Sequence, residues 1–315
     1  MPIQRLLLTN PACSDDTGLA TSSYTHDFTT SGEDTGAWEV TAGNVTYTSS
    51  GAEFTITKSG DAPTIQSNWY IFFGRVSFFL KAAPGTGIVS SAILESDDLD
   101  ELDWEWLGGT GYVDQVQSNY FGKGNTTTYD RAAWTTASAT QSTVHNYTIA
   151  WTSSATTWYI DEVAVRTLNY ADAVSGTNYP QTPMNIRIGI WAGGDSNNDE
   201  GTIQWAGGET TYSDGPFTMY LEKIEVVNEN PGASYSYGDM TGDYTSIKIE
   251  DSDSSESDAT ATTAGTSTGT ETGMWWTASA SAKLAQAATS SATKPNIDIW
   301  QYLALSAVAV CALVW

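Results

Sequence analysis

A short run in which carboxylates alternate with large apolar residues constrains this chain more than any other feature. The run reads Glu-Leu-Asp-Trp-Glu, and alternate residues of a β-strand point to opposite faces of a sheet. Glu101, Asp103 and Glu105, the carboxylate triplet, would therefore share one face. Leu102 and Trp104 would share the other face and pack into a core. The run predicts a β-strand that presents three acids to one side of a sheet.

Three like charges on one face favour protonation of at least one of them near neutral pH. A protonated acid beside an ionised carboxylate is what cleavage of a glycosidic bond needs. The pattern leaves open a solvated acidic edge, because Glu95, Asp97, Asp98 and Asp100 precede the triplet. The alternation with Leu and Trp argues for the buried strand instead. The glycine pair at 108–109 fits a strand that ends at the rim of a cleft.

The triplet predicts a retaining mechanism in two steps. Glu101 would attack the anomeric carbon as the nucleophile while Glu105 donates a proton as the acid/base, and Asp103 would orient one of the glutamates. Residues four apart on a flat strand lie about 13 Å apart at Cα, whereas a retaining pair needs carboxyl groups roughly 5–5.5 Å apart. We therefore expect a strongly curved strand that carries the triplet on a concave face.

Composition excludes some partners and favours others. The 315 residues include 12 Lys and Arg against 37 Asp and Glu, a formal charge of −25, so nucleic acid is not an expected partner. The 13 Trp and 16 Tyr suit a β-protein with a stacking surface for sugars. His26 and His145 are too few for a zinc cluster, and 195–199 predicts a turn and not a calcium loop. No metal or cofactor is predicted.

Residues 22–240 predict one all-β domain with the architecture of a β-sandwich. Short apolar and aromatic runs alternate there with Gly, Asn, Asp and Ser clusters, and no long segment has helical periodicity. The expected strands are 52–58, 69–81, 90–94, 102–107, 147–151, 157–160, 163–168, 185–191 and 217–227.

The two ends of the chain predict a secreted, surface-bound protein. Residues 1–21 are an N-terminal segment with a short apolar stub of a signal peptide, and the sequons at Asn44, Asn125 and Asn146 predict N-glycans. Residues 241–295 predict an acidic, Ser/Thr-rich linker that forms a disordered stalk. The apolar tail 296–315 predicts a GPI signal with attachment near Ser290, and an uncleaved tail anchor is the rival.

Several separated motifs resemble a known family. Glu101 to Glu105 matches the E-x-D-x-E signature of glycoside hydrolase family 16. The segments 96–109, 81–87, 119–124 and 189–195 are similar, in the same order, to the fungal Crh cell-wall transglycosylases. The resemblance covers about residues 20–240.

The resemblance implies a concanavalin-like β-jelly-roll and a transfer of chitin to β-1,3/β-1,6-glucan in the fungal wall, with secretion and a GPI anchor. It assigns Glu101 as the nucleophile and Glu105 as the acid/base. It also places sugar-binding positions on Glu105, Arg187, Trp191 and Thr202, and we add Tyr120 from the motif at 119–124. Trp191 in a Gly-rich strand end would offer a stacking platform. The chain departs from the family in its start, which keeps Cys13 without the expected partner cysteine.

Two other functions share these residues. A plain endo-β-glucanase or chitinase would use the same first step and release the sugar to water. A lectin-like carbohydrate binder would use the fold without turnover, which the intact triplet disfavours.

Overall fold

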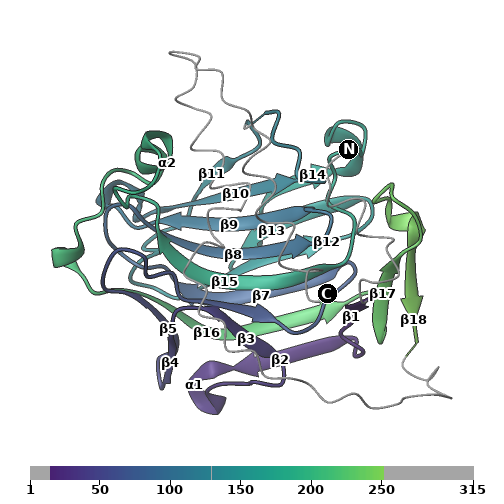
Figure 1. The fold of residues 1–315 in the computed structure, drawn as a ribbon, viewed down its shortest axis with the longest axis horizontal. Helices are drawn as coiled ribbons and strands as arrows, with labels where there is room; N and C mark the ends of the chain where they lie inside the picture. Colours follow the sequence, from purple (N-terminus) through teal and green to yellow (C-terminus); the bar gives the residue numbers. More distant parts are fainter. Residues whose placement is uncertain (1–14, 129, 252–315) are drawn as a thin grey trace, which may run out of the picture.

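Two large antiparallel β-sheets packed face to face form most of the described chain, residues 15–128 and 130–251 of a computed structural model (Figure 1). The seven-stranded sheet has the order β11 (Ala133–Thr136), β10 (Gln115–Phe121), β9 (Glu101–Leu107), β8 (Ile88–Ser96), β15 (Met184–Ala192), β6 (Thr64–Ser67) and β3 (Trp38–Ala42). The eight-stranded sheet has the order β14 (Val163–Asn169), β13 (Ala155–Ile160), β12 (His145–Trp151), β7 (Gly74–Lys81), β16 (Phe217–Asn228), β5 (Gly51–Ile56) and β4 (Val45–Thr48), with β2 (Ser23–Asp27) paired to β16.

A small third sheet lies at one end of the sandwich, on the right in Figure 1. It contains β1 (Asp16–Thr17), β17 (Ser234–Tyr237) and β18 (Ile247–Glu250). The helices are short: α1 (Phe28–Ser31), α2 (Glu200–Trp205) and the 3₁₀ turns η2 (Thr110–Tyr112), η3 (Tyr170–Asp172), η4 (Tyr212–Asp214) and η5 (Tyr244–Ser246). The all-β sandwich that the sequence predicts is confirmed.

The main core fills the space between the two large sheets. Leu102, Trp104 and Trp106 of β9 point into it and are fully buried. The rings of Trp106 and Trp104 lie 4.6 Å and 5.8 Å from Tyr147 of β12, which belongs to the opposite sheet. Because alternate residues point to opposite faces, the carboxylate triplet points away from the eight-stranded sheet. We call this side of the seven-stranded sheet its outer face.

The folded domain extends beyond the boundaries of 22 and 240 expected from the sequence. Residues 247–250 form β18, in which Ile249 pairs with Tyr235, and Asp16 of β1 pairs with Tyr235 from the other side. The alternation of Ile247 and Ile249 with Lys248 and Glu250 is the strand signal that the charged composition concealed. The first ten residues of the expected linker, 241–250, therefore belong to the folded domain.

The expected strand at 69–81 is wrong in its first half. The chain leaves β6 at Ser67, and β7 begins only at Gly74. Phe73 and Gly74 have φ values of 60° and 133°, which a regular strand does not contain. A run of apolar residues can therefore form a buried turn as well as a strand.

Several expectations fall outside the described residues, namely Cys13, the linker from 252 to 295, Ser290 and the tail 296–315. Within the described ranges, no helix has the length and apolar character to cross a bilayer.

Replacing Trp104 by Ala should lower the free energy of unfolding by about 3–5 kcal/mol, because the change leaves a large cavity under β9. Chemical denaturation followed by circular dichroism measures this loss. Val163→Ala, at a side chain that is 64% exposed, is the control and should change stability by less than about 0.5 kcal/mol. Equal losses in the two variants would contradict the packing described here.

Candidate active site

The carboxylate triplet lies in the middle of the seven-stranded sheet. Strand β9 pairs with β8 on one side and β10 on the other, and Figure 1 shows these strands as arcs. Glu101, Asp103 and Glu105 are 3%, 0% and 1% exposed. The sheet therefore holds three acids in a row on one face, in an environment screened from bulk water. Carboxylates in such an environment are expected to interact more strongly with each other and with a substrate than they would in water.

The strand register identifies the neighbours of each acid on the outer face. Directly opposed residues on antiparallel strands point to the same side. The pairs are Glu105 with Ser91 and Gln117, Asp103 with Ile93 and Asn119, and Glu101 with Glu95 and Phe121. Amide and hydroxyl groups thus flank the Glu105 end of the row, and a fourth carboxylate flanks the Glu101 end.

Arg187 of β15 neutralises that fourth carboxylate. Its guanidinium donates to Oε2 of Glu95 at 2.5 Å and to Oδ1 of Asn185 at 3.1 Å. The register pairs Arg187 with Ile93, and Ile93 with Asp103, so Arg187 lies on the outer face. Its ion-pair partner is Glu95, which lies opposite Glu101 in the strand register.

Asp100 anchors the start of β9, one residue before Glu101. Its buried carboxylate accepts hydrogen bonds from the backbone N–H of Lys123 (2.9 Å), Gln181 (2.7 Å) and Thr182 (3.2 Å), from the Lys123 ammonium (3.1 Å) and from the Thr182 hydroxyl (2.9 Å). Two other chain segments are thereby tied to the residue next to Glu101. Charge-assisted bonds of this kind are the strong ones in proteins.

Asp98 belongs to the same network. It accepts from the hydroxyls of Ser96 at 2.8 Å and Thr182 at 2.7 Å, and Lys123 Nζ lies 3.9 Å away. Burial, together with repulsion from Asp100, raises the pKa of Asp98 to about 6. A buried carboxyl that ionises only near pH 6 makes this corner of the site sensitive to pH.

The opposite sheet braces the underside of the triplet. Trp158 of β13 donates its indole N–H to the backbone oxygen of Asp103 at 3.1 Å. Arg166 of β14 lies 4.7 Å over the Trp158 ring and donates to the backbone oxygen of Ser118 on β10 at 2.8 Å. Burial lowers the pKa of Arg166, and the nearby Tyr120 and Asp103 oppose that shift. The sequence analysis missed both residues, since nothing in the local pattern links 158 or 166 to 103.

Trp191 and Thr202 lie at the Glu105 end of the outer face. Trp191 shares a row with Val89 of β8, and its ring stacks on Trp205 of α2 at 6.1 Å and 24°. Thr202 belongs to the same short helix and is 5% exposed. The structure thus brings Trp191 together with α2, the helix that carries Thr202. Trp191 itself is only 4% exposed, and Trp205 covers part of its ring.

Tyr120, predicted to bind substrate, faces the wrong way. It pairs with Leu102 and therefore points into the main core, where it is 7% exposed. The guanidinium groups of Arg131 and Arg166 lie 5.9 Å and 5.6 Å from its ring. Asn119, the residue before Tyr120, is the register partner of Asp103, so Tyr120 points to the opposite side of the sheet from the triplet.

The three sequons differ in the freedom of their amides. Asn44 is exposed between β3 and β4. Asn125 donates its side-chain amide to Asn178 at 2.9 Å, and Asn146 donates its own to Glu162 at 2.8 Å. Glycosylation at either of the last two would replace an existing hydrogen bond, so Asn44 is the most accessible of the three predicted sites.

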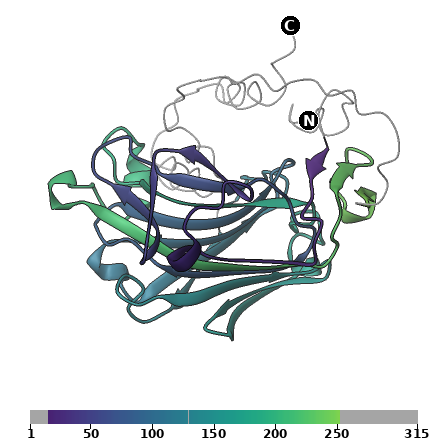
Figure 2. The same ribbon diagram turned by 90° about the horizontal axis from the view of Figure 1, so that it is seen from below.

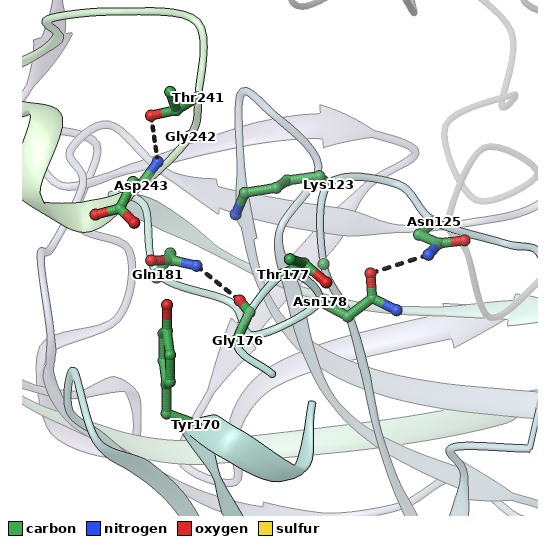
Figure 3. Close-up of a pocket in the computed structure, with 11 residues that line it drawn as sticks. Lys123, Asn125, Tyr170, Gly176, Thr177, Asn178, Gln181, Thr241, Gly242 and Asp243 are labelled. Atoms are coloured by element: carbon green, nitrogen blue, oxygen red, sulfur yellow. Dashed lines mark hydrogen bonds between the residues drawn. The ribbon is translucent and has the colours of Figure 1, made fainter. Parts of the chain in front are cut away.

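A cavity of about 510 Å³ opens beside the Asp100 network (Figure 3). Its lining comprises Gly122, Lys123, Asn125, Tyr170, Gly176, Thr177, Asn178, Gln181, Thr241, Gly242 and Asp243. Figure 3 shows the bonded Asn125 and Asn178 on one side and Gln181 and Asp243 on the other. No member of the triplet lines this cavity, so it adjoins the support of β9 and not the row of acids. Within residues 15–128 and 130–251, no group of three or more His, Cys, Asp or Glu side chains could hold a metal ion.

A β-sandwich that carries a central row of acids on its outer face is the arrangement of a glycosidase, and comparison with known proteins specifies the family. Residues 32–207 match the model of Glycosyl hydrolases family 16. The chain belongs to this family, and it is an enzyme of the glycosidase and transglycosylase type.

Close relatives carry a Crh name. Crh-like protein 1 of Aspergillus fumigatus is 58% identical over 244 residues, which are 78% of this chain and 67% of that protein. Congo red hypersensitive protein 1 of Saccharomyces cerevisiae is 47% identical over 246 residues, 77% of this chain and 46% of that protein. The chain thus spans about half to two thirds of the length of these relatives.

Solved structures agree with the fold. An apo Crh5 transglycosylase is 55% identical with a TM-score of 0.73, covering 76% of this chain and 100% of its own. A Crh5 transglycosylase in complex with NAG has the same identity and TM-score and covers 99% of its own chain. A Bacillus licheniformis β-glucanase, at 22% identity and a TM-score of 0.56, shares the fold.

Replacing Asp98 by Asn should change how stability depends on pH. Because its pKa is raised in the folded state, the folded protein holds the Asp98 proton more tightly than the unfolded chain. As pH rises from about 4 to about 6, the wild type should lose about 3 kcal/mol that Asp98→Asn does not lose.

Urea denaturation of both proteins at pH 4, 5, 6 and 7 measures this difference. Asp214→Asn, at an exposed aspartate, is the matched control and should follow the wild type. A constant difference between wild type and Asp98→Asn over this range would show that Asp98 does not titrate as described.

Proposed function

We propose that the protein is a retaining transglycosylase that cleaves chitin and transfers it to a β-glucan acceptor. The observation that carries the proposal is the position of the carboxylate triplet at the centre of the outer face, in a chain 55% identical to a Crh5 transglycosylase. The donor is inferred from the complex of that relative with NAG, the sugar unit of chitin. The acceptor, a β-1,3- or β-1,6-glucan, rests on the resemblance of the motifs.

The first step forms a covalent sugar ester. Glu101 attacks the anomeric carbon as the bond from that carbon to the leaving oxygen breaks, and Glu105 gives its proton to that oxygen. The second step reverses the roles. Glu105 removes the proton from an acceptor hydroxyl, the acceptor oxygen attacks the anomeric carbon, and the ester to Glu101 breaks. Two displacements at one carbon retain its configuration.

The surroundings of β9 support these roles. Strand curvature is required to bring the two carboxyl groups to the separation of a retaining pair. Ser91 and Gln117, the register neighbours of Glu105, carry no charge. At the other end, Arg187 and Glu95 form an ion pair beside Glu101. Asp103 between them is proposed to orient one of the glutamates.

Transfer and not hydrolysis requires that sugar outcompetes water at the ester. A site that excludes water and binds a sugar chain on the acceptor side meets this requirement. An endo-acting hydrolase would use the same first step, so the products decide. Chitin oligomers incubated with a labelled glucan oligosaccharide should give labelled hybrid chains, and shortened oligomers alone would indicate a hydrolase.

We propose a location at the cell surface or in the cell wall for the same reasons. The sequons at Asn44, Asn125 and Asn146, the Ser/Thr-rich linker and the apolar tail support secretion and a lipid anchor attached near Ser290. Mass spectrometry of the C-terminal peptide from the native protein identifies such an anchor.

Replacing Glu101 by Gln should reduce both transfer and hydrolysis by at least about three orders of magnitude, because no ester can form. The variant should still bind chitin oligomers, since the side chain keeps its size. Rates are followed by the labelled-acceptor assay and binding by calorimetry. Glu229→Gln, at an exposed glutamate, is the control. Comparable rates in the wild type and Glu101→Gln would refute the nucleophile assignment.

Replacing Glu105 by Gln should produce a loss that depends on the leaving group. A glycoside with an acidic aryl leaving group needs little protonation, so ester formation should suffer much less than with a sugar leaving group. Burst kinetics on the aryl glycoside and steady-state rates on chitin oligomers separate the two. Equal losses on both substrates would contradict the role of Glu105 as the acid.

A further inference from the structure

Aromatic side chains from four elements gather at the Glu105 end of the outer face. Trp191 of β15 stacks on Trp205 of α2 at 6.1 Å, and the ring of Tyr112 of η2 lies 5.4 Å from the ring of Trp134 of β11, tilted by 30°. Tyr112 and Trp205 both pack on a small apolar cluster that contains Trp191 and Leu107. We call Trp191, Trp205, Tyr112 and Trp134 the aromatic rim. It extends across the strands from β15 to β11, alongside the row that contains Glu105.

Trp134 occupies a defined place relative to the acid/base. The register pairs Trp134 with Gln117, and Gln117 with Glu105, so the three residues share one row and one face. Two strand spacings separate Trp134 from Glu105 at Cα, about 10 Å. A short oligosaccharide bound across β9 at Glu105 would therefore reach the indole of Trp134.

Trp134 is also the most open member of the rim. It is 42% exposed, whereas Trp191 is 4% exposed. Strand β11 is the edge of its sheet, where a large apolar side chain invites unwanted association. The main core does not include Trp134, so packing alone does not account for this residue. Tyr112 contacts the Trp134 ring from one side. Gly207 leaves room for the Tyr112 ring, because an added Cβ there would lie 3.0 Å from it.

We propose that Trp134, supported by Tyr112, is a platform for a neutral pyranose ring of the sugar chain that the enzyme holds across β9. The apolar C–H face of a β-linked sugar packs well on an indole ring, and a neutral ligand avoids repulsion from a chain of charge −25. The site lies on the β10–β11 side of the scissile bond, opposite to Trp191 on β15. It selects chains long enough to extend from Glu105 to the sheet edge. This inference rests on the proposed function.

The platform is tested by the length dependence of catalysis. Wild-type KM should fall as oligosaccharides become long enough to reach Trp134, and Trp134→Ala should flatten that dependence, with a rise in KM of about tenfold for the longest chains. Trp134→Tyr, which keeps a ring, should recover most of the loss. Thr136→Ala, an exposed position on the same strand, is the control, and thermal unfolding verifies that each variant folds.

Two series of substrates determine whether the sugar ring on Trp134 belongs to the donor or to the acceptor. In one series the chitin oligomer is lengthened at fixed glucan, and in the other the glucan oligosaccharide is lengthened at fixed chitin. An effect of Trp134→Ala in the chitin series places the donor on the platform, and an effect in the glucan series places the acceptor there. The same length dependence in Trp134→Ala and wild type, in both series, would overturn the proposal.

Binding separates this inference from the proposed function. In the Glu101→Gln background, calorimetry with long chitin and glucan oligosaccharides should show affinity that falls about tenfold when Trp134→Ala is added. If the wild type forms no hybrid product yet this difference is found, the transglycosylase assignment fails and the platform stands. If transfer is observed and the affinities are equal, the platform fails and the proposed function stands.

Discussion

The rest of the structure depends on strand β9, whose inner face packs in the core and whose outer face carries the acids. Side chains of β9 that point inward, Trp104 and Trp106, fill the core between the sheets, and those that point outward form the carboxylate triplet. Any movement of the strand that loosens the core also moves the acids. Packing energy, which is large for buried indoles, therefore fixes the position of groups whose own mutual repulsion would separate them.

The supports of β9 come from its start and from the core side. At its start, Asp100 accepts hydrogen bonds from Lys123 and from the adjacent residues Gln181 and Thr182, which lie more distant in the sequence. From below, Trp158 holds the backbone oxygen of Asp103 across the sandwich. These groups touch backbone or buried charge and not the outer face, so they act on the chemistry through position. A carboxylate triplet that is held in place by such supports needs little rearrangement when a sugar binds.

Charge is arranged unevenly along the row. At the Glu101 end, Arg187 and Glu95 form an ion pair beside the acids, and at the Glu105 end the neighbours are an amide, a hydroxyl and then the aromatic rim. The two glutamates therefore lie in different surroundings although they belong to one strand. Such asymmetry is what allows two carboxyl groups of one type to take the roles of base and acid.

The five-residue alternation of the sequence determined which residues share a face. It was sufficient to predict a β-strand with Glu101, Asp103 and Glu105 on one side. The side of the sheet on which Tyr120 lies was not determined by its own sequence, because it follows from the pairing of β10 with β9. Only the tertiary structure decided that Trp158 and Arg166 lie beneath Asp103, that Trp134 shares a row with Glu105, and that residues 247–250 complete a third sheet. These facts depend on which strands become neighbours, and a strand carries the period of its own faces but no record of its partner, because pairing is settled by the packing of the whole sandwich.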